Sequence, residues 1–197
     1  MSETQSNPEH DTHEMFQQRW SPRAFDADKP VSKQDLHRCL EAARWAPSCF
    51  GDEPWRFIVC HKEENEAMWQ KLLSCLAPKN QEWAQHAPVL LVACTHTVFS
   101  HNGQGNRWAE YDTGAASVSL CLQAAAIGLV THQMGGFDAD AVRATFHVPE
   151  DVKPMAAIAL GYRGKTEHLD EGFQAIEKAE RKRKNLAEIT FFKGWDV

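Results

Sequence analysis

Residues 19–25 read RWSPRAF. This stretch places two guanidinium groups, on Arg19 and Arg23, on either side of the Ser21 hydroxyl. Pro22 stands between them, where it stops a preceding helix. Arginine forks bind phosphate through parallel hydrogen bonds, and a nearby hydroxyl can donate to the same oxygens. By itself this pattern is more typical of a basic surface turn, in which Arg23 pairs with Asp26 or Asp28, and a phosphate site is the interpretation that the other stretches must support.

Two further stretches are rich in glycine, serine and proline, which are typical of loops. Residues 46–55 read APSCFGDEPW, and residues 134–138 read MGGFD. A glycine lets the main chain approach a planar ring closely, because it has no side chain to hold the ring away. A plain turn between a strand and a helix would also explain this glycine pair.

The composition is that of an ordinary globular protein. The 197 residues carry a net charge of -6, with 43% hydrophobic and 24% charged residues. The acidic balance argues against nucleic acid or an anionic membrane as a partner, and no apolar run approaches the ~20 residues that span a bilayer. We expect a disordered tail at residues 1–11, without the apolar core of a secretory signal, and a single domain at residues 12–197.

The six cysteines are scattered, without the Cys-x-x-Cys spacing of a metal or redox motif. Several lie inside apolar segments, where a buried and reduced thiol is the usual state. We therefore expect a cytoplasmic protein with no metal site and no structural disulfide. A metal site at His10 and His13 is a weaker alternative to a solvated acidic tail.

Hydrophobic periodicity predicts an α+β fold, with helices flanking a central mixed or antiparallel sheet of about five strands. Ser32 and Asp35 form a capping pattern at a helix start, and Asp138 caps another helix. The apolar run at residues 89–94 is typical of a strand covered on both faces. Helices are expected at residues 12–19, 32–46, 63–76, around Trp83, 108–128 and 138–146, and strands at residues 55–60, 89–94, 129–134, 154–162 and 186–192.

Two segments indicate a second subunit. The helix at residues 108–128 is apolar nearly all round, so it should be buried on every side, either at the centre of the fold or against a partner chain. The strand expected at residues 186–192 follows a highly charged segment and has no evident neighbour in its own chain. We expect it to pair with a sheet edge on another copy of the protein.

In this order, the stretches at residues 19–25, 46–55 and 134–138 resemble those of the nitroreductase family of FMN-dependent oxidoreductases. The similarity runs from about Phe16 to the C-terminus. It implies an intertwined homodimer with FMN at the subunit interface and a C-terminal strand exchanged between subunits. It also implies a ping-pong cycle, in which NADH or NADPH reduces the flavin and a nitroaromatic, quinone or similar planar acceptor then takes the electrons.

The resemblance also implies cofactor contacts by position. Arg19, Trp20 and Ser21 fall along the FMN phosphate and ribityl chain, and Arg23 falls near flavin N1 and the C2 carbonyl. A cation there stabilises the negative charge of the reduced ring. The flavin performs the chemistry, so no side chain is an obligatory catalytic group. The other implied contacts are Pro47, Ser48, Cys49 and Gly51 from the second subunit, Asn80 at the pyrimidine edge, Met134, Gly135 and Gly136 near N5, and Arg181 and Arg183 at the phosphate.

The stretch at residues 46–55 departs from the family's usual Pro-Ser-Ser-x-Asn-x-Gln-Pro-Trp. Cys49 replaces the second serine, Gly51 the asparagine and Glu53 the glutamine, so two amide side chains are lost. Cys49 is either a redox thiol or, as its isolation from other cysteines favours, a small residue lining the pocket. Asn80 also has a second interpretation, as the N-cap of the short helix that follows it.

Other functions remain open at this stage. A protein that binds FMN without turnover, as a store or sensor, is compatible with the altered stretch, and the same fold includes a flavin-dependent dehalogenase. A Rossmann enzyme is discarded, because Gly103 and Gly105 lie in a polar loop and do not follow an early strand.

The electron acceptor is expected to bind near residues 99–111. Phe99, His101, Trp108 and Tyr111 suggest an aromatic-lined entrance suited to planar molecules. Burial in the core would explain Trp108 and Tyr111 equally well.

Overall fold

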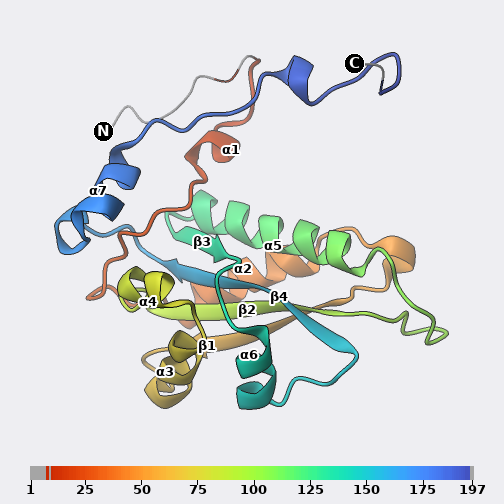
Figure 1. The fold of residues 1–197 in the computed structure, drawn as a ribbon, viewed down its shortest axis with the longest axis horizontal. Coiled ribbons are helices and arrows are strands. Elements are labelled where there is room, and N and C mark those ends of the chain that lie inside the picture. The colour runs from red at the N-terminus through yellow and green to blue at the C-terminus, as the bar shows by residue number, and fades with distance from the viewer. Residues whose placement is uncertain (1–7, 9, 196–197) are drawn as a thin grey trace.

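The computed structural model describes residue 8 and residues 10–195 (Figure 1). A four-stranded antiparallel sheet lies at its centre, with the strand order β1-β2-β4-β3. The strands are β1 (Trp55–His61), β2 (Val89–His96), β3 (Val130–Met134) and β4 (Val152–Gly161). Each matches a predicted strand, so the four are confirmed. Most of the tail expected to be disordered, residues 1–11, lies outside the described residues.

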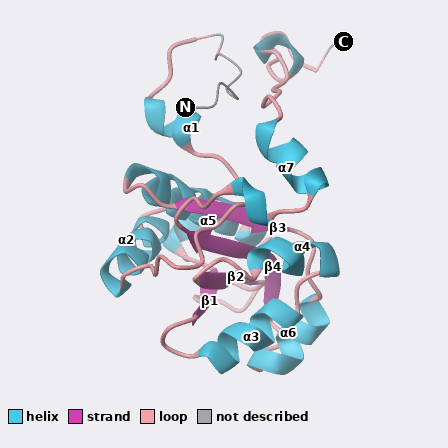
Figure 2. Ribbon diagram, turned by 90° about the vertical axis from the view of Figure 1, so that its left-hand side faces the viewer, coloured by secondary structure: helices cyan, strands magenta, loops and turns pink. Residues whose placement is uncertain are grey.

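Helices cover both faces of the sheet. α2 and α5 lie on one face, and α3 and α6 lie on the other (Figure 1, Figure 2). Among the described residues, no helix has both the length and the apolar content needed to cross a bilayer. The helices are α1 (Glu14–Gln18), α2 (Lys33–Arg44), α3 (Glu66–Ser74), α4 (Pro78–Ala84), α5 (Ala109–Ala126), α6 (Ala139–Phe146) and α7 (Glu171–Lys178), with 3-10 turns η1 (Cys49–Gly51), η2 (Thr166–His168) and η3 (Leu186–Glu188).

β2 is the strand at which the two layers meet. Successive side chains of a strand point to opposite faces, and Leu91 accordingly packs in the cluster with α2 and α5, whereas Leu90 packs in the cluster with α3, α4 and α6. Every residue from Val89 to Thr95 is buried. The prediction of a strand covered on both faces is therefore confirmed.

Two predicted helix starts are also confirmed. The Ser32 hydroxyl accepts a hydrogen bond from the main-chain N–H of Asp35 at 3.0 Å, and the Asp138 carboxylate accepts one from Ala141 at 2.9 Å. Each side chain satisfies a main-chain donor that would otherwise have no partner in the first turn.

The C-terminal segment differs from the prediction. Residues 186–192 hold the turn η3 and irregular chain that runs away from the sheet (Figure 1), so the described residues form four strands and not five. A capping box favours the turn, because the main-chain N–H of Asn185 donates to Glu188 Oε2 at 2.8 Å. A strand without a neighbour would leave its main-chain groups unpaired. Within one chain, the local turn therefore prevails.

Helix α7 is absent from the predicted elements. Its first turn is capped by Asp170, whose carboxylate accepts from the main-chain N–H of Phe173 at 2.7 Å. The helix spans eight residues with only two large apolar side chains, Phe173 and Ile176, which are too few to establish a helical period. It nevertheless buries Glu177, which is 2% exposed.

One side of α5 remains exposed in the single chain. Tyr111 is 78% exposed and Val118 is 43% exposed, so complete burial at the centre of the fold is wrong for the chain by itself. The alternative environment, against a partner chain, stays a prediction.

Replacing Ser32 by alanine removes the cap of α2. We expect Ser32→Ala to lower the free energy of unfolding by about 1 kcal/mol, because the Asp35 N–H loses its partner. Urea denaturation followed by circular dichroism measures the change. The exposed Gln34 of the same helix is the control, and Gln34→Ala should change stability by less than about 0.5 kcal/mol. Equal effects of the two substitutions would contradict the assignment of the cap.

Candidate functional site

The stretch at residues 19–25 brings together the groups expected to bind phosphate. Arg19 Nη1 donates to Ser21 Oγ at 3.1 Å, and both residues are half-buried. The indole of Trp20 lies under Arg163, with 5.4 Å between the guanidinium carbon and the ring centroid. Trp20 Nε1 is buried and has no hydrogen-bond partner among the described residues. A buried N–H without a partner is unfavourable by about 1–3 kcal/mol.

Arg181 joins this stretch from the C-terminal segment. Its Nη1 donates to the carbonyl oxygen of Arg19 at 2.9 Å, and its Nη2 to that of Gln17 at 2.6 Å. Burial lowers the pKa of Arg181, and the nearby positive charges of Arg183 and Arg19 lower it further. Within the described part of the chain, no carboxylate forms an ion pair with these three arginines. The result is a cluster of positive charge without a carboxylate counter-ion among the residues that the structure describes.

Arg23 does not form the surface ion pair of the competing interpretation. Among residues 10–195 its guanidinium pairs with no aspartate. It lies instead between two aromatic rings, 5.4 Å from the centroid of Phe173 and 6.0 Å from that of Trp83. Such cation–π contacts fix the position of a cation while leaving its N–H donors available.

The peptide bond before Arg23 is held on both sides by side chains that the sequence did not identify. His132 Nδ1 lies 3.0 Å from the carbonyl oxygen of Pro22. The main-chain N–H of Arg23 donates to Glu177 Oε1 at 2.7 Å. β3 supplies His132 and α7 supplies Glu177. β3 reads VTHQM, a half-polar strand in which the sequence does not single out His132.

The ionisation of these two residues reflects their burial. Burial lowers the pKa of His132 to about 4, and the positive charge of Arg23 adds to this, against the opposing effect of the hydrogen bond to Pro22. The ring is therefore neutral at pH 7, and Nδ1 carries its proton because a carbonyl oxygen can only accept. Burial also raises the pKa of Glu177, while the Arg23 N–H and the charges of Arg163 and Arg23 oppose the rise.

Asn80 and the glycine pair meet beside this group. Asn80 Nδ2 donates to the carbonyl oxygen of Gly136 at 2.9 Å. The N-cap of α4 is Ala77, so the interpretation of Asn80 as an N-cap is wrong. A Cβ at Gly136 would lie 2.7 Å from Asn80 Nδ2, whereas a Cβ at Gly135 would meet no atom within 4 Å. A methyl group at Gly136 would have to displace the half-buried Asn80 amide that donates to the Gly136 carbonyl oxygen, whereas Gly135 faces open space next to the buried Met134.

The second predicted group, Pro47, Ser48, Cys49 and Gly51, lies at the other end of α5. The main-chain N–H of Cys49 donates to Asp112, a buried residue in the first turn of that helix, at 2.9 Å. Gly51 has a φ of 65°, a left-handed conformation that glycine adopts readily. Cys49 is half-buried and free.

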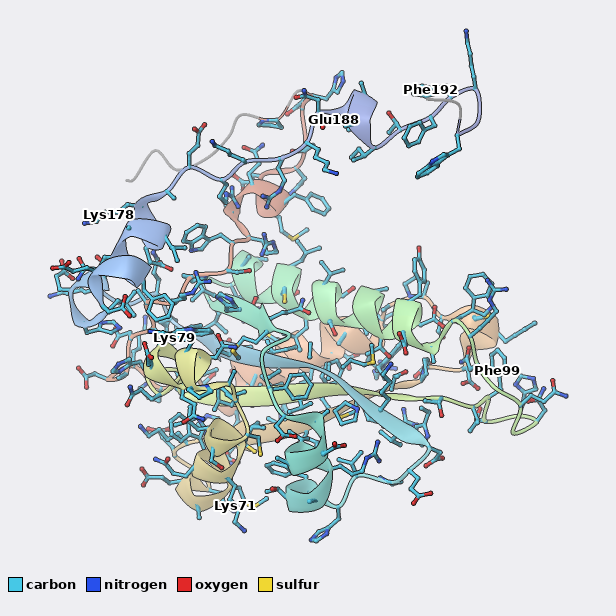
Figure 3. The ribbon with its side chains drawn as sticks, viewed as in Figure 1. Lys71, Lys79, Phe99, Lys178, Glu188 and Phe192 are labelled. Atoms are coloured by element: carbon cyan, nitrogen blue, oxygen red, sulfur yellow. The ribbon has the colours of Figure 1, made fainter. Side chains whose placement is uncertain are left out.

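The structure therefore divides the predicted residues into two groups. The first group is Arg19, Trp20, Ser21, Arg23, Asn80, Met134, Gly135, Gly136, Arg181 and Arg183, which lie on or in the segments next to α1, α4, β3 and α7. Figure 3 marks the positions of α4 and α7 by Lys79 and Lys178. The group at residues 47–51 lies at the opposite end, near Phe99 (Figure 3). Within one chain the two groups do not meet.

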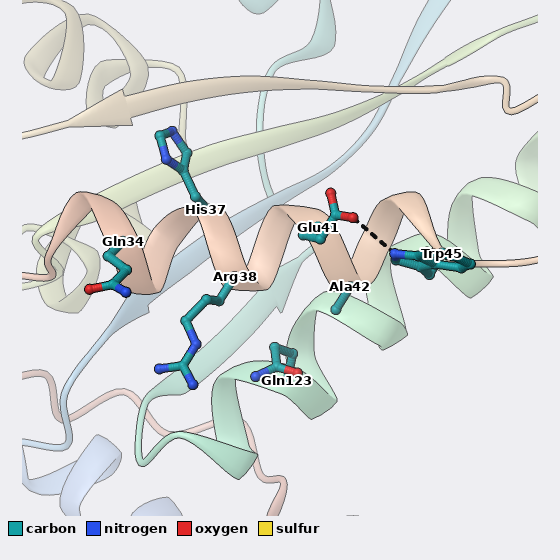
Figure 4. Close-up of a pocket in the computed structure, with 7 residues that line it drawn as sticks. All are labelled: Gln34, His37, Arg38, Glu41, Ala42, Trp45 and Gln123. Atoms are coloured by element: carbon teal, nitrogen blue, oxygen red, sulfur yellow. Dashed lines mark hydrogen bonds between the residues drawn. The ribbon is translucent and has the colours of Figure 1, made fainter.

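A surface hollow of about 790 Å³ on α2 and α5 contains none of the predicted residues. It is lined by Gln34, His37, Arg38, Glu41, Ala42, Trp45 and Gln123 (Figure 4). Trp45 Nε1 donates to Glu41 Oε1 at 2.9 Å. This polar partner and the exposure of the lining make it a weaker candidate than the arginine cluster. In the described part of the chain, no three acidic, histidine or cysteine side chains form a metal-binding group.

The two glycines give a matched pair of substitutions. Gly136→Ala should lower the free energy of unfolding by about 1–3 kcal/mol, because its methyl group collides with Asn80. Gly135→Ala should change it by less than about 0.5 kcal/mol, since the added methyl meets nothing. Thermal and urea unfolding measure both. A larger loss for Gly135→Ala than for Gly136→Ala would contradict this packing.

Burial of neutral His132 makes stability depend on pH. Between pH 6.5 and about 4 the unfolded chain binds a proton at this residue and the folded chain does not. Stability is therefore complete above pH 6.5 and falls as the pH is lowered, by at most about 3 kcal/mol. His132→Asn keeps an N–H donor and does not titrate, and the raised pKa of Glu177 acts in both proteins. Urea unfolding between pH 7 and pH 4 should show the free energy of unfolding falling more steeply in the wild type than in His132→Asn. Parallel curves for the two proteins would refute the role of His132.

Comparison with known proteins identifies the family. The model of the nitroreductase family matches residues 16–162. A protein of Staphylococcus haemolyticus, provisionally named an NAD(P)H nitroreductase, is 30% identical over 205 aligned positions, which cover 82% of this chain and 92% of the relative. The crystal structure of an oxidoreductase containing FMN superposes with a TM-score of 0.90 at 32% identity, covering 96% of each chain. A nitroreductase family protein of Clostridium difficile superposes with a TM-score of 0.70 at 26% identity, covering 93% of this chain and 99% of the other. The chain belongs to the nitroreductase family.

Proposed function

We propose that the protein is an FMN-dependent oxidoreductase that uses NADH or NADPH to reduce a planar acceptor, such as a nitroaromatic or a quinone, in a ping-pong cycle. The observation that carries the proposal is the cluster of Arg19, Arg181 and Arg183, which has no carboxylate counter-ion among the described residues. Bringing like charges together is unfavourable unless an anion offsets them. A phosphate group offers that charge in a form that arginine binds well.

The side chains near the cluster fit the remaining parts of FMN. The Ser21 hydroxyl and the unpaired Trp20 Nε1 are positioned for the phosphate and ribityl chain. Asn80 and the open space at Gly135 fit the edge of a flat ring. When bound, FMN would accept a hydride from the nicotinamide and pass it to the acceptor. Arg23 would supply a fixed positive charge that stabilises the electron-rich ring.

The same arrangement supports a homodimer. Residues 47–51 and the arginine cluster lie at opposite ends of α5 in one chain, so a site that uses both groups requires a second copy. Exposed apolar side chains are available to bury in such an interface, including Tyr111 and Val118 on α5 and Ile189 and Phe192 in the C-terminal segment. The expected exchange of that segment between subunits is part of the proposal.

Aromatic rings near residues 47–51 support a planar acceptor. Phe50, Phe99 and His101 form a cluster in which the ring centroids lie 5.2–5.9 Å apart. Phe50 is 84% exposed and has a φ of 56°, a conformation that a bulky residue rarely adopts without a functional reason. Trp108 and Tyr111 are also exposed, which argues against a purely structural role in the core.

The state of the cysteines fits a reducing compartment. All six are free, and five of them are buried. Structural disulfides are typical of oxidising compartments, so the free thiols support the expected cytoplasmic location.

An anaerobic titration tests the proposed activity. The purified protein should show a flavin absorbance spectrum that NADPH or NADH bleaches and that a quinone or nitroaromatic restores. A flavin spectrum that neither nucleotide bleaches would favour the alternative of a flavin store or sensor. A colourless protein that takes up no added FMN would refute the proposal altogether.

Substitution of Arg23 tests the proposed electrostatic role. Arg23→Ala should lower the midpoint potential of the bound flavin by about 30 mV or more, which corresponds to 1.4 kcal/mol for two electrons, while the melting temperature changes little. Lys29→Ala is the control, because the Lys29 ammonium lies over Tyr162, 3.6 Å from the ring centroid. An unchanged potential and reduction rate in Arg23→Ala would contradict the assignment.

A further inference from the structure

We infer that His132 and Glu177 are positioning residues, which together hold the Pro22–Arg23 peptide and so direct the Arg23 guanidinium toward the flavin. This inference rests on the proposed function, because it concerns the same site. It assigns a role to two residues outside the three sequence stretches typical of the family. His132 lies two residues before the third stretch, and Glu177 lies far from all three. Neither residue is expected to touch the flavin.

The two hydrogen bonds act on a single rigid unit. A peptide bond is planar and its C=O and N–H point in opposite directions. His132 holds the carbonyl side at 3.0 Å and Glu177 holds the N–H side at 2.7 Å. A planar group held at both edges cannot rotate freely about the chain axis. The direction in which the Arg23 side chain leaves the main chain is thereby fixed.

Two aromatic rings, Phe173 on α7 and Trp83 on α4, hold the Arg23 side chain. Phe173, one helical turn before Glu177 on α7, lies 5.4 Å from the Arg23 guanidinium carbon. The centroid of the Trp83 ring lies 6.0 Å from the same guanidinium carbon. Trp83 also packs against the His132 imidazole, with 4.5 Å between the ring centroids. Main chain and side chain are thus fixed by one connected set of groups.

α7 continues into a second contact with the same stretch. Arg181, four residues after Glu177, donates to the carbonyl oxygens of Gln17 and Arg19. Residues 177–181 therefore hold the main chain of residues 17–23 at three points. This segment acts as a brace for the part of the chain that carries Arg19, Ser21 and Arg23.

A carboxylate is an unusual choice if only burial were needed. Glu177 is 2% exposed, and its Oε2 has no hydrogen-bond partner among the described residues. Burying a carboxyl group with an unsatisfied oxygen is unfavourable compared with an apolar side chain of similar size. The hydrogen bond to Arg23 and the nearby charges of Arg23 and Arg163 give the group a reason to be there.

Paired substitutions separate a hydrogen-bond role from simple packing. Glu177→Leu fills the space but cannot accept a hydrogen bond, whereas Glu177→Gln keeps an acceptor for the Arg23 N–H. Likewise, His132→Leu removes the donor to Pro22, and His132→Asn presents an N–H in the place of Nδ1. The exposed Glu180 provides the control, Glu180→Leu.

Three measurements are made on the full-length protein. Hydrogen exchange of the Arg23 amide, in protein freed of FMN, reports on the hydrogen bonds that hold the Pro22–Arg23 peptide in the absence of flavin. Titration with FMN gives the dissociation constant, and spectroelectrochemistry gives the midpoint potential. Circular dichroism and the melting temperature confirm that each variant is folded.

We expect Glu177→Leu to speed exchange at Arg23, to weaken FMN binding by about tenfold and to lower the midpoint potential. Glu177→Gln and Glu180→Leu should stay within about threefold of the wild type in affinity. In an Arg23→Ala background, Glu177→Leu should lower the potential no further, because its effect acts through Arg23. If Glu177→Leu does not fold, the His132→Leu and His132→Asn pair gives the same comparison.

Wild-type exchange, affinity and potential in a folded Glu177→Leu would overturn the inference. Equal losses of FMN affinity in Glu177→Leu and Glu177→Gln would also overturn it. So would a fall in midpoint potential caused by Glu177→Leu that is as large in the Arg23→Ala background as in the wild type. A wild-type protein that binds no FMN would instead refute the proposed function. The exchange experiment would still test whether His132 and Glu177 hold the Pro22–Arg23 peptide. The two failures are therefore distinguishable.

Discussion

Burial of β2 on both faces is the constraint on which the rest of the structure depends. A strand that is apolar on both sides requires a layer of helices on each, and α2 with α5 supplies one layer while α3, α4 and α6 supply the other. The short strand β3 then occupies one edge of the sheet. From that edge His132 reaches the chain at Pro22, so the core fixes the position of the functional stretch.

At that edge, like charges and hydrogen bonds are concentrated around the main chain of residues 17–23. Positive charge collects at Arg19, Arg181 and Arg183, and the buried Glu177 carboxylate accepts from a peptide N–H and forms no ion pair with them among the described residues. Arg181 already donates to the carbonyl oxygens of Gln17 and Arg19, so the cluster offers an anion its positive charge and its remaining N–H donors. On the proposed function, a bound phosphate would offset the repulsion between these charges and stabilise the folded chain.

The sequence predicted the features that depend on local pattern. The β2 run and the Ser32 and Asp138 caps all follow from neighbours in the chain. Helix α7 was missed because its eight residues hold only two large apolar side chains. Residues 186–192 form a turn because the Asn185 capping box is local while a strand needs a partner. His132 and Glu177 reach their partners across 110 and 154 residues, a separation that periodicity and motifs do not encode.

The central claim is that the arginine cluster binds the phosphate of a flavin mononucleotide. Isothermal titration of the protein freed of cofactor, with FMN and with riboflavin in parallel, tests this most directly, because the two ligands differ only in the phosphate. Charge-assisted hydrogen bonds to phosphate predict that FMN binds at least about 100-fold more tightly than riboflavin, with one FMN per chain. Equal affinities for the two ligands would contradict the account.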